Sequence, residues 1–204
     1  MAPDDPVVGR LAPTRIEVRG AGGMSVMDDL RRNPESDIST EGYVVEIVDG
    51  RVIMTPQGPD QDDTVFEIRS QVRDRHGKDL KTASDVLVDF PGGTWLAPDV
   101  TLLAPDAVRH GNRYVCTDVL AVIEFVSLKG DPNDYITKVE KYGRFGITSY
   151  LIVDPFTATC TLLEDPQPTG YGKRTEIPFA ETVRLPLADG RVVELDTSSF
   201  PVIR

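Results

Sequence analysis

Three acidic residues stand in or beside apolar segments of this chain, where a charge is costly to bury. Glu124 is the one ionisable residue in "VLAVIEFVS", Glu46 stands in "VVEIV", and Asp99 opens the apolar run in "APDVTLL". A buried carboxylate without a partner takes up a proton, pairs with a cation or binds a metal. Mg²⁺ is held by one or two carboxylates together with water and substrate phosphate. These acids therefore fit metal-dependent phosphodiester hydrolysis.

Each acid also has an ordinary structural explanation. Glu124 could reach solvent at the end of its strand or pair with an arginine. A hairpin glutamate such as Glu46 is usually solvated, and a Pro-Asp pair usually marks a turn. Strand alternation places Val122, Glu124 and Val126 on one face, near the strand's carboxyl end, where sites of α/β proteins are found. Three such acids at the margins of three strands favour a common site.

A lysine on the following segment could complete this site. The run "DPNDYITKVEKYGRFG" predicts a helix with Pro132 in its first turn. At about 100° per residue, Lys138 lies roughly 60° from the centre of an apolar stripe that would pack on the sheet. The stripe consists of Tyr135, Val139 and Tyr142. The ammonium of Lys138 could contact a phosphate or an attacking water, or the lysine could simply flank the interface.

The remaining pattern alternates strands with two helices. Asp49-Gly50 joins two apolar runs and is a strong hairpin signal. Periodic apolar residues predict a helix over 62–77. Strands are predicted at 85–90, 100–103, 119–127 and 149–155, and the chain from residue 157 onward is predicted to form β-hairpins.

The first 23 residues differ from the rest, because proline, glycine and charged residues dominate there. We predict a flexible extension over 1–23. An alternative is that "TRIEVRG" forms a short strand that pairs across subunits of a dimer. One domain is predicted over 24–204, and it begins with a helix signal in "MSVMDDLRRNP".

Composition narrows the function classes. The chain has 204 residues, 40% of them hydrophobic, and a formal net charge of −11. This charge predicts that the protein does not have the broad basic surface that is typical of nucleic-acid-binding proteins. Its two cysteines, Cys116 and Cys160, have no metal-ligand spacing and fit a reducing compartment. No run approaches the roughly 18 apolar residues of a membrane span. We expect a cytoplasmic protein without a membrane partner.

The order of these parts resembles the Uma-two family of restriction-endonuclease-like proteins, a branch of the PD-(D/E)XK nuclease superfamily. The resemblance rests on "VVEIVDGRVIMTP", "APDVTLL", "VIEFVS" followed by "DYITKVEKYGRFGITSYLIVDP", and "ETVRLPLADGRVVELD". It implies an α/β (α+β) fold with a restriction endonuclease-like core, in which helices flank a mixed central β-sheet and β-hairpins follow.

The resemblance also implies roles for the residues that match the family's motifs. Asp99 and Glu124 would hold Mg²⁺ or Mn²⁺, and Glu46 would be a further metal or water ligand. The superfamily's lysine position falls on Val126 here, so its role passes to Lys138. Three further matches lie near the site, namely Ser127, Asp134 and Tyr142. The implied activity is that of an endonuclease with DNA as substrate, acting as a homodimer.

Two positions depart from the family pattern. Asp62 stands where members often carry a histidine, and Leu96 stands where many carry an arginine. Both departures, together with the acidic charge, leave a second hypothesis open. In that alternative the chain is a catalytically inert binding or regulatory protein that keeps the nuclease fold.

Overall fold

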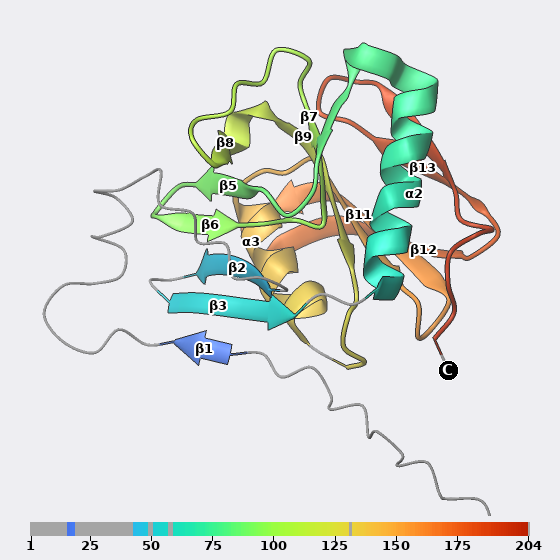
Figure 1. The fold of residues 1–204 in the computed structure, drawn as a ribbon, viewed down its shortest axis with the longest axis horizontal. Coiled ribbons are helices and arrows are strands. Elements are labelled where there is room, and N and C mark those ends of the chain that lie inside the picture. Colours follow the sequence, from blue (N-terminus) through green and yellow to red (C-terminus); the bar gives the residue numbers. More distant parts are fainter. Residues whose placement is uncertain (1–15, 19–42, 49–50, 57–58, 131, 204) are drawn as a thin grey trace, which may run out of the picture.

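A six-stranded mixed sheet forms the centre of the protein (Figure 1). The computed structural model describes residues 16–18, 43–48, 51–56, 59–130 and 132–203. The parallel pairing of β9 with β10 is accompanied by antiparallel pairings elsewhere in the sheet, so the predicted mixed sheet is confirmed. In spatial order its strands are β12 (Gly170–Pro178), β11 (Thr159–Gln167), β10 (Ser149–Asp154), β9 (Val119–Phe125), β7 (Val100–Leu103) and β4 (Lys81–Ala83).

A second sheet contains the predicted hairpin. Val48 pairs with Arg51 in an antiparallel register, as the predicted hairpin requires. The short strand considered for "TRIEVRG" is present and pairs with β3 of its own chain. The helix signal in "MSVMDDLRRNP" lies outside the described residues. In spatial order this sheet consists of β1 (Ile16–Val18), β3 (Arg51–Pro56), β2 (Tyr43–Val48), β6 (Thr94–Leu96), β5 (Leu87–Phe90) and β8 (Arg113–Val115).

One face of the central sheet is covered by α2 (Pro59–His76), which matches the helix predicted over 62–77 except at Gly77 and begins three residues earlier. Ile68 and Val72 of α2 are buried against Ile123 and Phe125 of β9. The hairpin of β13 (Thr182–Pro186) and β14 (Val192–Asp196) adds Val183 and other buried residues to the same cluster. This packing accounts for the apolar period of the α2 sequence.

The opposite face packs against α3 (Lys138–Arg144) and the second sheet. Tyr142 of α3 is fully buried, with its ring edge-on to Tyr150 at a centroid distance of 5.0 Å. Gly143 lets α3 approach β12, because a Cβ built there would lie 1.9 Å from the carbonyl oxygen of Gly170. Val122 and Val126 also belong to this cluster, which confirms that alternation places Glu124 on the α3 side of β9.

The start of this helix differs from the prediction. Residues Asn133–Thr137 form a π-helical turn, in which the amide of Lys138 donates to the carbonyl of Asn133, before regular α3 begins. Such turns insert an extra residue into a helix and are frequent at functional sites. Counting about 100° per residue from Tyr135 therefore misplaces the side chains that follow.

The sequence pattern did not predict three of the strands, namely β4, β6 and β8, each of three residues. So short a run contains too few residues to display a period of two.

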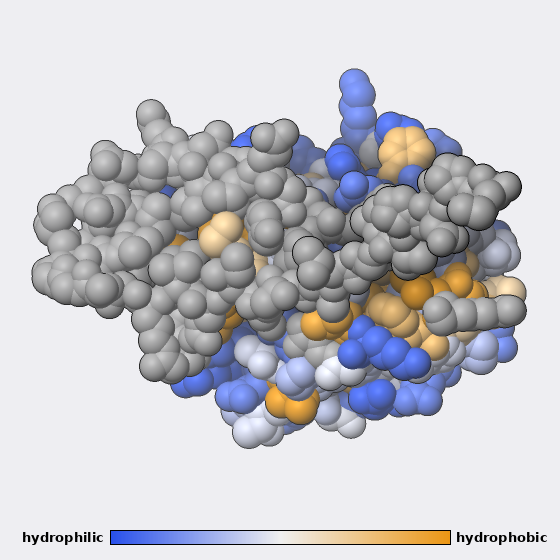
Figure 2. Space-filling model, turned by 60° about the horizontal axis from the view of Figure 1, so that its bottom comes forward, coloured by the Kyte–Doolittle hydropathy of each residue, from blue (hydrophilic) through white to orange (hydrophobic). Residues whose placement is uncertain are grey.

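Among the described residues, no helix is both long and apolar enough to cross a bilayer. The described surface in Figure 2 shows small hydrophobic groups among hydrophilic ones. Both cysteines are unpaired, and Cys160 is buried in the core.

Candidate active site

The three acids singled out in the sequence converge in the folded chain. Glu46 comes from β2, Asp99 directly precedes β7, and Glu124 lies near the end of β9. They are only 2%, 6% and 1% exposed, yet all three line one small cavity of about 30 Å³. Lys138, Asp134 and Ser127 line the same cavity. The sequence prediction thus named six side chains that the fold brings together.

Main-chain amides hold the acids in place. The amide of Phe125 donates to Asp99 Oδ2 at 2.6 Å, and the amide of Asp99 donates to Glu124 Oε2 at 3.4 Å. The amide of Ala97 donates to Glu46 Oε1 at 3.2 Å. Hydrogen bonds from backbone N–H groups stabilise the charged form of a carboxylate and fix its orientation.

Lys138 lies at the centre of the acids. Its Nζ is 2.8 Å from Glu124 Oε2, 3.4 Å from Asp134 Oδ1 and 3.8 Å from Glu46 Oε1. The residue is 7% exposed, so it is more deeply buried than the interface-flanking lysine considered from the sequence. The π-helical turn just before it accounts for that difference. The proposed relocation of the lysine from Val126 to the helix is compatible with this geometry, because Val126 is buried among apolar side chains.

The charges in the cavity do not balance, since four carboxyl groups face one ammonium. Burial raises the pKa of Asp99 to about 7, although the charge of Lys138 opposes the rise. Burial likewise raises the pKa of Glu124 well above its usual value. For Lys138, burial lowers the pKa, but Glu124 and the other acids outweigh burial and hold it well above its usual value. The cavity therefore retains protons near neutral pH that a bound cation would displace.

Two further matches to the family pattern contact the same groups. The hydroxyl of Tyr142 donates to Glu124 Oε1 at 2.7 Å, and burial raises the pKa of this tyrosine well above its usual value. Asp134 is buried, and its carbonyl accepts a hydrogen bond from the hydroxyl of Tyr150 at 2.9 Å. Ser127 lines the cavity and is half-buried.

Sequence reasoning missed Gln61. Its Nε2 donates to Asp99 Oδ1 at 2.6 Å, while the neighbouring Asp62, matched to a histidine of the family, is exposed. The family match at Asp62 had already drawn attention to the neighbouring position. Gln61 lies in the first turn of α2, which is the end of the helix nearest the strand acids. Leu96, matched to an arginine, is buried in the core and contributes no charge.

The oxygen atoms around Asp99 suit a hard divalent cation. Gln61 Oε1 is buried and has no hydrogen-bond partner among the described residues, so an uncommitted amide oxygen lies beside the Asp99 carboxyl group. Within those same residues, His, Cys, Asp and Glu side chains nowhere form a group of three that could hold a metal. Mg²⁺ requires only one or two carboxylates when water and substrate phosphate complete its shell. Asp99 and Glu124 with Gln61 fit that requirement.

Comparison with known proteins identifies the family of this chain. Residues 28–197 match the model of the Uma2 family, whose description is "Putative restriction endonuclease". The chain belongs to this family. Membership supports a nuclease function, and it confirms the resemblance that the sequence motifs suggested.

A solved structure shares this fold. The crystal structure of "a putative nuclease belonging to DUF820 from Anabaena variabilis ATCC 29413" superposes with a TM-score of 0.55 at 17% sequence identity. The match covers 78% of this chain and 88% of the other chain. A search of curated proteins found no match. The similarity confirms the predicted restriction endonuclease-like core.

Proposed function

We propose that this protein is a DNA endonuclease that requires Mg²⁺ or Mn²⁺. The observation that carries the proposal is the convergence of Asp99 and Glu124 on one buried cavity beside the Lys138 ammonium, in a chain of a nuclease family. Acids on neighbouring strands with a lysine within reach are the groups that phosphodiester hydrolysis needs.

Each residue has a distinct role in this proposal. Asp99 and Glu124 would hold the cation, with Gln61 Oε1 as an additional oxygen ligand. A divalent cation would lower the pKa of a water molecule and offset part of the charge on the phosphate. Lys138 would place a positive charge against the phosphate or orient the attacking water.

The surrounding residues would support these groups. Glu46 and Asp134 would keep Lys138 charged and oriented through their contacts of 3.8 and 3.4 Å. Tyr142 would fix the rotamer of Glu124 through its hydrogen bond. Ser127, at the cavity wall, is a candidate contact to substrate. A cytoplasmic location and a homodimer remain predictions, to be checked by fractionation and by light scattering.

Plasmid nicking tests the proposal. The purified protein is expected to convert supercoiled plasmid to open circles with Mg²⁺ or Mn²⁺ and not with EDTA. Asp99→Ala and Lys138→Ala should abolish nicking. Matched controls are Asp189→Ala and Lys173→Ala, which remove the same charges from the surface. Equal nicking by the wild type and both site variants across several metals would exclude this site as the source of activity.

An inert binding or regulatory protein is the second candidate. One observation favours it: the Lys138 ammonium already contacts Glu124 at 2.8 Å and so offsets part of the charge that a metal would offset. The net charge of −11 also opposes binding of a polyanion. Calorimetric titration separates the two candidates, since the nuclease should bind millimolar Mn²⁺ through Asp99 and the inert protein should not.

A further inference from the structure

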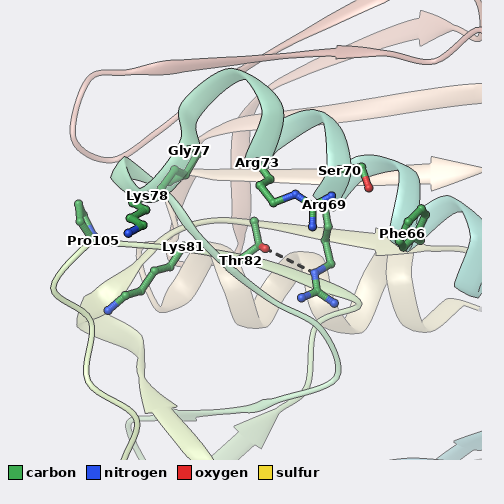
Figure 3. Close-up of a pocket in the computed structure, with 10 residues that line it drawn as sticks. Phe66, Arg69, Ser70, Arg73, Gly77, Lys78, Lys81, Thr82 and Pro105 are labelled. Carbon is green, nitrogen blue, oxygen red and sulfur yellow. Dashed lines mark hydrogen bonds between the residues drawn. The ribbon is translucent and has the colours of Figure 1, made fainter.

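A second cavity lies away from the acids, between α2 and the edge strand β4 (Figure 3). Its volume is about 610 Å³, and we call it the α2 groove. Side chains of α2 from Phe66 to Arg73 form one wall, and residues from the turn after α2 and from β4 form the other. The lining consists of Phe66, Arg69, Ser70, Arg73, Gly77, Lys78, Leu80, Lys81, Thr82 and Pro105.

The α2 groove is basic in a strongly acidic chain. Its lining holds four cationic side chains and no acid, whereas the chain as a whole carries −11. Among the described residues, ion pairing of these four is recorded for Arg73 alone, which lies 3.9 Å from its exposed neighbour Asp74. Arg69 Nε donates to Thr82 Oγ1 at 3.4 Å, and Lys81 Nζ donates to the carbonyl of Ala107 at 2.8 Å. These neutral partners leave positive charge for an anionic ligand.

The spacing on α2 gives the groove a linear form. Phe66, Arg69 and Arg73 recur at intervals of three and four residues, so they lie along one stripe of the helix. From Phe66 to Arg73 the helix advances seven residues, or about 10 Å, and Lys78 follows in the 3-10 turn beyond the helix end. At about 3.4 Å per nucleotide along one strand of a duplex, that length matches roughly three successive phosphates. A single small anion would use only a fraction of this length.

An exposed aromatic ring lies at one end of the stripe. Phe66 is 67% exposed, the largest exposure among the large hydrophobic side chains of the described residues. Nothing in the packing of α2 requires a phenylalanine there, because the buried stripe of the helix holds Ile68 and Val72. Proteins that bind single-stranded nucleic acids combine a cationic groove with exposed aromatic rings. The phosphates contact the cationic side chains, and a base stacks on the ring.

The groove and the acid site share two elements. Gln61 contacts Asp99 at the start of α2, and Arg69 follows eight residues later, about 12 Å along the helix. Lys81 pairs with Leu103 at the far end of β7, about 13 Å from Asp99 at strand rise. A nucleic-acid strand would cover either distance within a few nucleotides.

We propose that the α2 groove binds a single strand of the nucleic-acid substrate, a few nucleotides from the position of cleavage. Phosphates lie against Arg69, Arg73, Lys78 and Lys81, and an unpaired base stacks on Phe66. The inference rests on the proposed function, which makes nucleic acid the substrate. It explains how a chain of net charge −11 retains a polyanion, since the attraction is concentrated in one groove.

Fluorescence polarisation in EDTA tests the groove apart from cleavage. The probe is a fluorescein-labelled single strand of about 15 nucleotides. Arg69→Gln combined with Lys78→Gln should raise its Kd at least about tenfold and reduce the slope of log K against log salt by about 1.4, at about 0.7 per phosphate contact. The matched control, Lys173→Gln with Arg184→Gln, removes two exposed charges elsewhere and should leave Kd within about twofold.

Two further arms identify the ligand. Phe66→Ala should weaken single-strand binding about 5- to 150-fold and affect a duplex probe much less, because only an unpaired base can stack. Inorganic tripolyphosphate should compete weakly. Strong competition by tripolyphosphate without oligonucleotide binding would overturn the proposal in favour of a small polyphosphate ligand.

Other outcomes separate the groove from the nuclease proposal. Oligonucleotide binding that depends on the groove, without cleavage under any metal, would contradict the nuclease and support the groove. Cleavage with unchanged binding by the Arg69 and Lys78 double variant would contradict the groove alone. Absence of oligonucleotide binding by the wild type, or equal losses in the test and control variants, would also overturn it.

Discussion

Asp99→Asn should stabilise the folded protein at alkaline pH while removing any metal-dependent activity. The Asp99 carboxyl group is buried, and burial raises its pKa from 3.8 to about 7. Asparagine has nearly the same shape and never ionises. Its Oδ1 can still accept from the amide of Phe125. Its Nδ2 would replace the oxygen that accepts from Gln61 Nε2, so the Gln61 amide must turn over, after which Gln61 Oε1 accepts from Nδ2.

The raised pKa of Asp99 determines the sign and the size of the expected change in the free energy of unfolding. Between pH 4 and 7 the folded protein keeps a proton on Asp99 that the unfolded chain has lost, so the free energy of unfolding of the wild type falls as pH rises. The loss is at most about 1.4 kcal/mol per pH unit and about 4 kcal/mol in all by pH 8. Asp99→Asn avoids this loss. Its advantage should be close to zero at pH 4 and up to about 4 kcal/mol at pH 8.

Urea unfolding in EDTA from pH 4 to pH 8 measures the difference between the two proteins. The single tryptophan, Trp95, is 5% exposed and reports unfolding by its fluorescence. The control is Asp189→Asn on the surface, where the hydrogen bond from Arg191 lowers the pKa of the carboxyl group. A lowered pKa makes the control's effect constant over pH 5 to 8.

Two results would refute this reasoning. A variant less stable than the wild type at pH 8 would mean that the Asp99 carboxylate is well compensated in the fold. A difference that does not change with pH would mean that Asp99 does not titrate in this range. Addition of Mn²⁺ provides a further check, because it should stabilise the wild type and leave Asp99→Asn unchanged.

Three other substitutions test the packing around the site. Lys138→Met should cost about 3–5 kcal/mol near neutral pH and less at pH 5, because it leaves Glu124 without its cation; urea unfolding at both pH values measures this. Tyr142→Phe should cost about 1–3 kcal/mol by removing the hydrogen bond to Glu124, and a cost below a few tenths would show that the bond contributes little. Gly143→Ala should lower the thermal midpoint by several degrees, because its Cβ would overlap the carbonyl of Gly170; calorimetry that finds no change would contradict the close packing of α3 on β12.

The sequence was sufficient for the elements whose pattern is long or chemically distinctive. The hairpin at Asp49-Gly50, the helix α2 and the strand β9 all follow from turn chemistry or apolar period. The lone charge of Glu124 in an apolar run pointed correctly to a buried carboxyl group. The three-residue strands β4, β6 and β8 could not be predicted, because tertiary pairing and not local period defines them.

At the site, residue types were easier to predict than contacts. The sequence pattern predicts a common site for Glu46, Asp99, Glu124 and Lys138, and all four line one cavity. The depth of Lys138 was missed, because no sequence signal distinguishes a π-helical turn from an α-helical one. The contact of Gln61 with Asp99 depends on how α2 packs on the sheet, which a single sequence does not encode locally.

The reciprocal hydrogen bonds between Asp99, Phe125 and Glu124 have a consequence for how the family can vary in length. They tie the separation of the two acids to the strand spacing of about 4.8 Å, so the site tolerates no slip of β7 against β9. The irregularity in this pairing falls between Leu102 and Leu103, at the far end of β7. Residues inserted after this irregularity would leave the positions of both acids unchanged. One residue inserted between positions 99 and 102 would shift Asp99 along β9 and move its carboxyl group away from that of Glu124.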